Sequence, residues 1–201
     1  MTSHHNDIEP KLAALKARLE SYAPISEATW QRLRALCTTR TLAKGETLYA
    51  TGERPTSFAF VYRGLFRVYA LDADGREYNK HFFDEGMFPG SMAALLTETP
   101  SQFAFEALEA SEVLLIDFAA YRQLLFQSQD LMVFQIAYLE KNWLLAKDAR
   151  EVEIIQENAT QRYQRFLTDF ADMSERIPQY HIASHLGITP TQLSRIRKKL
   201  N

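Results

Sequence analysis

The sequence predicts an α+β protein in three parts: an antiparallel β-roll of the jelly-roll (double-stranded β-helix) type, a long helix, and a C-terminal helix-turn-helix. Short β-rich runs about ten residues apart follow Thr41, and this spacing is typical of jelly rolls. A heptad pattern begins near Asp130, and the C-terminal segment contains two short helices around a glycine. We place the three parts at residues 1–128, 129–156 and 157–201.

The composition is that of an ordinary globular chain. Of the 201 residues, 46% are apolar and 24% are charged, which is enough to bury a core. No apolar run approaches the roughly 20 residues that span a bilayer, and the N-terminal stretch lacks the pattern of a signal peptide. Cys37 is the single cysteine, which excludes an intrachain disulfide and a CxxC zinc site. We therefore expect a cytoplasmic protein.

Charge is distributed unevenly along the chain. Residues 157–201 carry seven Lys and Arg against four Asp and Glu, a net charge of +3. The whole chain carries -2, so residues 1–156 carry -5. A basic terminal module on an acidic body favours a polyanion as its partner. The alternative is that the cations only complement the negative end of a helix dipole.

Two helices and a series of strands make up the N-terminal part. Ile8–Tyr22 has leucines at helical spacing, and Ser26 opens a shorter helix that extends to Leu36. Turn residues such as Asp72–Gly75 then separate the β-rich runs. The expected strands are Phe58–Tyr62, Leu65–Leu71, Tyr78–Phe83, Phe103–Leu108 and Val113–Ile116.

One long helix is expected from about Asp130 to Ile155. Its seam alternates steps of four and three residues and consists of Met132, Ile136, Leu139, Trp143 and Ala146, continued by Arg150 and Glu153. Such a repeat is typical of coiled coils, and a small protein offers so long a helix few partners. We therefore expect this helix to be the interface of a homodimer. The alternative is a helix that lies on the β-roll.

The C-terminal part begins with a capping box formed by Asn158 and Gln161. The helix that follows is predicted to bury one face, which consists of Tyr163, Phe166, Leu167 and Phe170. A second, short helix surrounds Ala183, and Gly187 supplies the positive φ of a tight turn between helices.

The last helix, Pro190–Leu200, has a complete start signal: Thr189 as N-cap, Pro190 at the first position and Gln192 in a second capping box. Spacing predicts that it buries Ile188, Leu193, Ile196 and Leu200. Gln can pair with adenine, Arg with guanine and Lys with phosphate, so we interpret the other face as a DNA-recognition surface. The candidate DNA-binding residues are Thr189, Thr191, Gln192, Arg195, Arg197, Lys198 and Lys199. An ordinary helical hairpin is the alternative.

In this order the elements resemble the Crp/Fnr superfamily of bacterial transcription regulators. The segments that carry the resemblance are Lys44–Tyr49 with Gly52-Glu53, Tyr62–Val68, Asp84–Gly90, and Ala159–Leu167 followed by Leu186–Leu200. The resemblance covers nearly the whole chain and implies a homodimer, a cyclic nucleotide-binding-like roll and a winged-helix-like DNA-binding domain. The implied partners are double-stranded DNA and a second copy, with RNA polymerase as a further candidate and no membrane partner.

The resemblance also shows where this chain departs from its relatives. Relatives that bind cyclic nucleotides carry a Glu for the ribose and an Arg for the phosphate, and Ser91 and Ser101 stand at these positions. Loss of the arginine removes a charge-assisted contact, so we expect weak or no cAMP binding and assign no cofactor. The candidate effector pocket consists of Phe88, Gly90, Ser91, Met92, Ser101, Gln102 and Phe103.

Other features of the family also lack their residues. An iron–sulfur cluster needs several cysteines, and His81 is the only histidine of the roll, a weak basis for haem ligation. His181 and His185 stand four residues apart without further ligands, so we expect them to contact phosphate or solvent. Residues 171–176 form a tight link where relatives insert a hairpin, so the wing is expected to be reduced or absent.

These patterns predict a transcription regulator rather than an enzyme. The second interpretation is a sensory module whose C-terminal domain docks a protein partner instead of DNA. An enzyme is the third: jelly-roll enzymes use clustered His and carboxylate ligands, and this roll has one histidine. The sequence also contains no Ser/His/Asp, Cys/His or phosphate-loop pattern, so we assign no catalytic residue.

Overall fold

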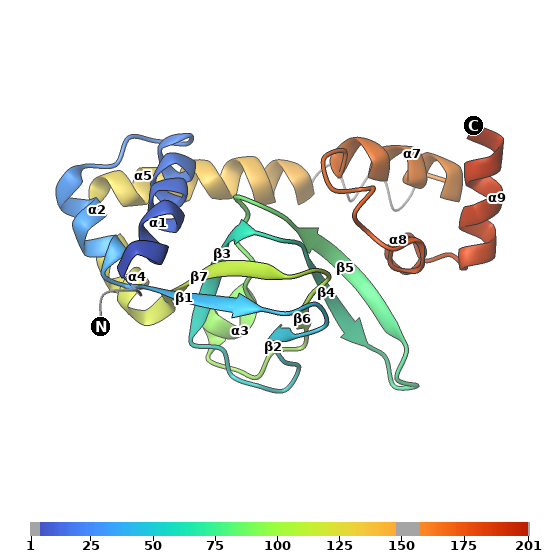
Figure 1. The fold of residues 1–201 in the computed structure, drawn as a ribbon, viewed down its shortest axis with the longest axis horizontal. Coiled ribbons are helices and arrows are strands. Elements are labelled where there is room, and N and C mark those ends of the chain that lie inside the picture. Colours follow the sequence, from blue (N-terminus) through green and yellow to red (C-terminus); the bar gives the residue numbers. More distant parts are fainter. Residues whose placement is uncertain (1–4, 148–156, 201) are drawn as a thin grey trace.

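The computed structural model describes residues 5–147 and 157–200. Two antiparallel sheets form the β-roll, with the strand orders β1-β7-β3 and β2-β6-β4-β5 (Figure 1). The strands are β1 (Cys37–Leu42), β2 (Thr47–Tyr49), β3 (Ser57–Arg63), β4 (Phe66–Leu71), β5 (Glu77–Phe83), β6 (Ala104–Ala107) and β7 (Ser111–Asp117). The predicted α+β class with a roll and a helix-turn-helix is confirmed, whereas the division at residues 128 and 156 stays a prediction.

The expected strands all occur, and within the roll the structure adds three elements that were not predicted. These are β1, β2 and the short helix α3 (Met92–Thr97). In β1 the four residues between Cys37 and Leu42 are all exposed, so the strand lacks the apolar alternation that signals a half-buried strand. It is held by pairing along β7 instead, from Cys37 opposite Ile116 to Leu42 opposite Ser111.

The N-terminal helices cover the outer face of the sheet β1-β7-β3. They are α1 (His5–Glu20), α2 (Glu27–Arg34) and α4 (Phe118–Leu125), which gather at the left of Figure 1. Ser26 is the N-cap of α2, as predicted, and accepts a hydrogen bond from the Thr29 amide. Leucines of α1 and aromatic side chains of β3 belong to one core cluster together with the start of the long helix.

The long helix crosses above the roll (Figure 1). It comprises α5 (Gln129–Leu139), a π-helical turn η1 (Glu140–Leu144) and further helical residues to Lys147. A π turn adds one residue to the helical repeat, so the regular seam predicted through Trp143 is interrupted. The positions Arg150 and Glu153 lie outside the described residues.

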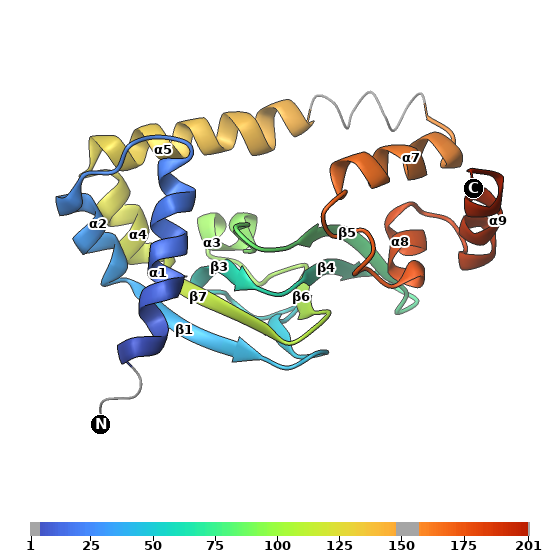
Figure 2. The same cartoon turned by 45° about the horizontal axis from the view of Figure 1, so that its top comes forward.

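Helices α7 (Ala159–Asp169), α8 (Gln179–His185) and α9 (Pro190–Leu200) form the C-terminal domain. In Figure 2 this domain lies beside β5, with α8 close to the strand and α9 at the far end. The sheet β2-β6-β4-β5 therefore has core on both faces, one inside the roll and one under the C-terminal helices. Among the described residues no helix is both long and apolar enough to cross a membrane.

Candidate nucleic-acid interface

Helix α7 begins at the predicted capping box. The Asn158 side chain accepts hydrogen bonds from the amides of Thr160 (3.0 Å) and Gln161 (3.1 Å), and the Gln161 side chain accepts one from the Asn158 amide (3.0 Å). Three of the four predicted core residues, Tyr163, Phe166 and Phe170, are buried. The prediction for Leu167 is wrong: it is 39% exposed, because the next residue along a helix points about 100° away from its neighbour.

The turn between α8 and α9 depends on Gly187. This residue has a φ of +66°, a conformation that side chains with a Cβ avoid. The Ile188 amide donates to the Ala183 carbonyl (3.0 Å) and the Gly187 amide donates to the Ser184 carbonyl (3.2 Å), which is the Schellman pattern. The chain therefore reverses direction with the final carbonyls of α8 satisfied.

Helix α9 is capped at its start and anchored by one residue. The Thr189 hydroxyl accepts a hydrogen bond from the Gln192 amide (3.2 Å), and the Gln192 side chain accepts one from the Thr189 amide (2.8 Å). Leu193 is fully buried, while Ile188 and Ile196 are partly buried against the same cluster. The prediction for Leu200 is wrong, because this residue is 41% exposed.

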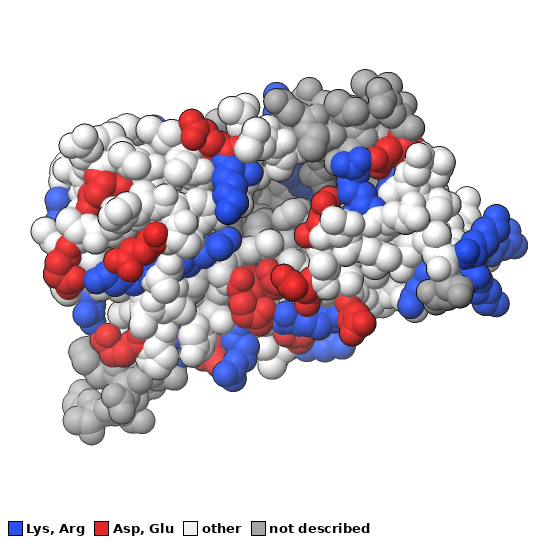
Figure 3. Space-filling model, turned by 90° about the horizontal axis from the view of Figure 1, so that it is seen from above, with Lys and Arg blue, Asp and Glu red and all other residues white. Residues whose placement is uncertain are grey.

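The opposite face of α9 is polar, basic and open. Thr189, Thr191, Gln192, Arg195, Lys198 and Lys199 are exposed, and Arg197 is half-buried. In Figure 3 Lys and Arg side chains gather at this end of the molecule. Pro190–Leu200 contains no acidic residue, so nothing within the helix neutralises these cations. Such a face can bind phosphates and reach base edges.

In Gln192 the capping contact to Thr189 competes with the predicted contact to a base. Its side-chain oxygen accepts hydrogen bonds from the amide and the hydroxyl (3.1 Å) of Thr189. Recognition of adenine by glutamine uses both the amide oxygen and the amide nitrogen. While the capping box is formed, Gln192 can therefore offer only its NH₂ group to a base.

The expectation that His181 and His185 contact phosphate or solvent is wrong. His181 is 4% exposed. Its Nδ1 lies 3.1 Å from the side-chain nitrogen (Nδ2) of Asn79 and 3.3 Å from the Arg67 guanidinium. His185 is partly buried, with its Nδ1 3.1 Å from the Asn79 carbonyl oxygen. Both rings face β4 and β5, because α8 turns this side toward the roll. Within the described residues no group of three His, Cys, Asp or Glu could hold a metal ion.

The candidate effector pocket is divided between two environments. Ser91 and Ser101 are buried, and their hydroxyl oxygens lie within hydrogen-bond distance at 2.9 Å. The Ser101 hydroxyl donates to the Phe103 carbonyl at 2.7 Å and accepts from the Phe103 amide at 3.1 Å. Phe103 packs against the interior of the roll.

The other pocket candidates face away from that serine pair or into solvent. Phe88 and Met92 pack against the cluster under the N-terminal helices, and Gln102 is exposed. A Cβ on Gly90 would come within 2.7 Å of the Phe58 Cβ, so glycine is required for the chain to approach β3 there. The seven candidates are therefore divided among two packing clusters, the buried serine pair and the surface.

The predicted dimer seam is partly exposed. Met132 is half-buried, whereas Ile136 (58%), Leu139, Trp143 and Ala146 are exposed. The π turn rotates the helix after Leu139, and the Asn142 side chain there donates to the Tyr22 hydroxyl at 3.0 Å. Exposed apolar side chains before and within this turn include Val133 and Leu144.

Comparisons with known proteins agree with this architecture. Residues 39–128 match the family model of the cyclic nucleotide-binding domain. FixK2 from Bradyrhizobium japonicum is 21% identical, with a TM-score of 0.69 over 82% of this chain and 84% of that chain. The c-di-GMP responsive global regulator CLP of Xanthomonas campestris is 20% identical, with a TM-score of 0.67 over 87% and 91%. The chain has the Crp/Fnr fold.

A third structure with this Crp/Fnr fold is the Catabolite Activator Protein of Thermus thermophilus. It is 19% identical, with a TM-score of 0.54 over 91% of this chain and 86% of that chain. The search of curated protein sequences found no significant match.

Within the Crp/Fnr fold, the serine pair does not suit a cyclic nucleotide. A cyclic phosphate carries a negative charge that needs a cation or a set of free donors. The Ser101 hydroxyl already donates its proton to the Phe103 carbonyl, and neither serine carries charge. These residues therefore do not fit the phosphate that the matched domain family is named for.

Proposed function

We propose that the chain is a cytoplasmic, homodimeric transcription regulator of Crp/Fnr type that binds a pseudo-palindromic DNA site. The observation that carries this proposal is the open face of α9. Thr191, Gln192, Arg195 and Lys199 lie exposed on a helix that is capped by Thr189 and anchored by Leu193. A helix with these residues fits the major groove, where arginine reads guanine.

A second copy of the chain is the proposed partner of the long helix. Val133 (50%), Ile136 and Leu144 (57%) expose apolar side chains that a monomer leaves in water. Because η1 adds one residue, the seam is proposed to pass from Leu139 to Leu144 rather than through Trp143. A dimer would bring two copies of α9 to half-sites about 34 Å apart.

The dimer proposal is tested by placing a charge in the seam. Ile136→Asp buries a carboxylate in the proposed interface, so we expect a monomer and loss of specific DNA binding. Leu71→Asp, at another exposed position on β4, is the matched control. Sedimentation velocity measures both variants, and an Ile136→Asp protein that stays dimeric contradicts the assignment.

We infer further that the regulator needs no cyclic nucleotide. The Ser91–Ser101 contact supports this, since it occupies hydroxyl groups at the positions that grip the nucleotide in relatives. Titration with cAMP is expected to give no saturable binding at micromolar concentration. Micromolar affinity would refute the inference.

DNA recognition is tested by selection from randomised duplexes with purified protein at roughly physiological salt and without added ligand. We expect a two-fold-symmetric motif to be enriched, and Arg195→Ala to lose preference at one position of each half-site. No enrichment from the wild type would refute effector-independent recognition. Binding that Arg195→Ala leaves unchanged would favour a protein partner for the C-terminal domain.

A further inference from the structure

The helix-turn-helix domain shares a hydrophobic core with the β-roll of the same chain. Leu65, Phe82 and Leu108 of the roll belong to one cluster with buried residues of the C-terminal helices, among them Phe166, Phe170, Ile182 and Leu193. The Phe82 ring lies 5.8 Å from the Phe170 ring and 6.2 Å from the Phe166 ring. Domains of one chain usually move relative to each other unless their interface is large and hydrophobic, and this interface is apolar at its centre.

A β-bulge prepares the roll for this contact. Val68 pairs with His81, but the next residue, Tyr69, pairs with Asn79, so β5 has one extra residue between these pairs. Asn79 and Phe82 are three residues apart and would lie on opposite faces of a regular strand. The bulge brings both onto the outer face, where Phe82 enters the shared core and Asn79 contacts α8.

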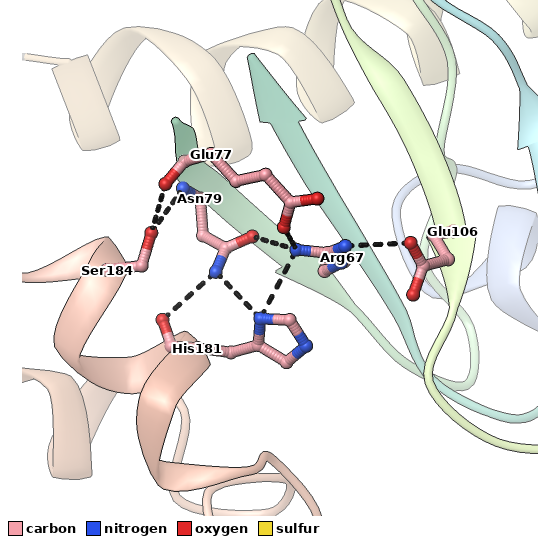
Figure 4. A network of polar contacts seen from close by, with 6 residues as sticks. All are labelled: Arg67, Glu77, Asn79, Glu106, His181 and Ser184. Atoms are coloured by element: carbon pink, nitrogen blue, oxygen red, sulfur yellow. Dashed lines mark hydrogen bonds and ion pairs between the residues drawn. The ribbon is translucent and has the colours of Figure 1, made fainter. Parts of the chain in front are cut away.

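Polar groups beside this core join β4 and β5 to α8 (Figure 4). The Arg67 guanidinium pairs with Glu77 and Glu106 (2.7 Å) and lies 3.3 Å from the His181 Nδ1. The Asn79 side chain donates to the His181 carbonyl at 3.2 Å. The Ser184 hydroxyl donates to the Glu77 carbonyl (2.9 Å) and accepts from the Asn79 amide (3.1 Å).

His181 is neutral in this setting. Burial and the neighbouring Arg67 cation lower the pKa of the His181 imidazole to about 4. A neutral imidazole has one acceptor lone pair at Nδ1, which the Arg67 guanidinium and the Asn79 side-chain NH₂ group share. His181 therefore contacts Arg67 as a neutral acceptor, while Glu77 and Glu106 of the roll balance the charge of Arg67.

A charged contact lies at the other end of the interface. Arg176, in the link between α7 and α8, binds Glu85 with both terminal nitrogens (2.9 and 3.0 Å) and Glu109 at 2.5 Å. Glu85 also accepts a hydrogen bond from the Gly64 amide at 2.7 Å, which holds its carboxylate in place. A bidentate pair of this kind fixes direction as well as distance.

We infer that the β-roll holds the helix-turn-helix domain in one orientation, and that Arg67, Asn79, His181 and Arg176 are positioning residues for α9. This inference rests on the proposed function. The docked side of α8 bears His181 and Ser184, whereas the predicted DNA-binding residues of α9 remain at the surface. Docking on the roll and contact with DNA can therefore occur together. A fixed orientation sets the half-site spacing that the dimer accepts.

The test breaks the charged contact without touching the apolar core. Arg176→Glu places a third carboxylate beside Glu85 and Glu109, and Arg122→Glu, at an exposed position on α4, is a control with the same change of charge. Affinity is measured for the selected motif and for the motif with one base pair added or removed between half-sites. One base pair moves a half-site by about 3.4 Å and turns it by about 34°, which a fixed domain cannot follow.

We expect the wild type and Arg122→Glu to lose about tenfold in affinity when the spacing changes. Arg176→Glu is expected to bind the natural spacing more weakly and to discriminate between spacings by less than about threefold, since only part of the population is docked. Unchanged discrimination by Arg176→Glu, or tighter binding than the wild type, would overturn the inference. Circular dichroism verifies that the variant is folded.

A second variant and a second measurement keep the inference separate from the proposed function. Asn79→Ala removes the side-chain contacts to His181 and should relax the spacing preference in the same direction. Amide hydrogen exchange of Asn79 needs no DNA: its N–H donates to Ser184, so exchange should be slow in the wild type and at least tenfold faster in Arg176→Glu, within the range of local opening equilibria. If the wild type selects no DNA motif, effector-independent DNA recognition is refuted, and the exchange measurement still tests the docking. Equal exchange in both proteins refutes the fixed orientation.

Discussion

The two helices of the helix-turn-helix differ in what covers them. Helix α8 buries His181, Ile182 and Ala183, and its polar side chains contact β4 and β5 of the roll. Helix α9 buries only Leu193 fully and leaves its polar and basic side chains in solvent. They are adjacent in sequence and joined by a turn at Gly187.

The difference follows from the cost of burying polar groups. A buried hydrogen-bonding group must find a partner within the protein, and α8 does so with Asn79 and Arg67. The cations of α9 have no acidic residue in their own helix, and Arg195, Lys198 and Lys199 are exposed, so these three remain available to an external anion. Helix α8 thus fixes the motif on the roll, and helix α9 exposes its basic side chains to solvent.

The largest effect is expected at the residue that joins the two helices to one core. Leu193→Ala removes a fully buried side chain, so the free energy of unfolding should fall by about 2–5 kcal/mol. Thermal unfolding followed by circular dichroism measures the change. Leu200→Ala, on the same helix but exposed, should change it by less than about 0.5 kcal/mol. Equal effects would contradict the assignment of Leu193 as the anchor.

A change on the open face of α9 should affect DNA binding and not stability. Arg195→Ala is expected to cost about 1–3 kcal/mol in binding free energy for the selected motif and to relax specificity at one position. Lys199→Ala should weaken binding to all sequences alike and reduce the salt slope by about 1. Titrations at several salt concentrations separate the two. Identical profiles for both variants would contradict a base contact by Arg195.

A change on the covered face of α8 should lower the stability of the protein. Ser184→Ala removes hydrogen bonds to the Glu77 carbonyl and the Asn79 amide, so stability should fall by about 1 kcal/mol. Ser194→Ala, at an exposed position of α9, is the control and should leave stability unchanged. Chemical denaturation measures both. A neutral Ser184→Ala would show that these bonds are replaced by water.

Acid should gradually weaken the docking of α8 on the roll, with no effect near pH 7. A free histidine has a pKa near 6.5, and the docked His181 has a pKa of about 4. As pH falls from about 6.5 to 4, His181 becomes protonated in the undocked state but stays neutral in the docked state. Proton binding therefore favours the undocked state, and docking weakens with decreasing pH. Protonation would also bring His181 into repulsion with Arg67, which Glu77 partly offsets.

The pH prediction is measured by hydrogen exchange of the Asn79 amide, corrected for the intrinsic rate at each pH. Protection should decline through this pH window in the wild type and should be flat in His181→Gln, which has no group that titrates there. The same decline in both proteins would assign it to another group.

Much of the helix-turn-helix could be predicted because its signals are local. The capping boxes at Asn158 and Thr189 and the turn at Gly187 depend on residues within three or four positions of each other. The same locality gives Gln192 two roles, as partner in the cap and as a contact to a base, and both use its one side-chain oxygen. The roles of the DNA-binding and dimer residues stay predictions.

The sequence by itself determined the order of the elements, the ends of α7 and α9, and the basic face of α9, because backbone capping and residue spacing act within one segment. Only the tertiary structure decided which side of α8 is covered. That choice depends on a bulge in β5, which places Asn79 and Phe82 on one face. A π turn separately changes which side chains of the long helix are exposed. Both insert a single residue into a regular repeat, and neither leaves a distinct pattern in the sequence.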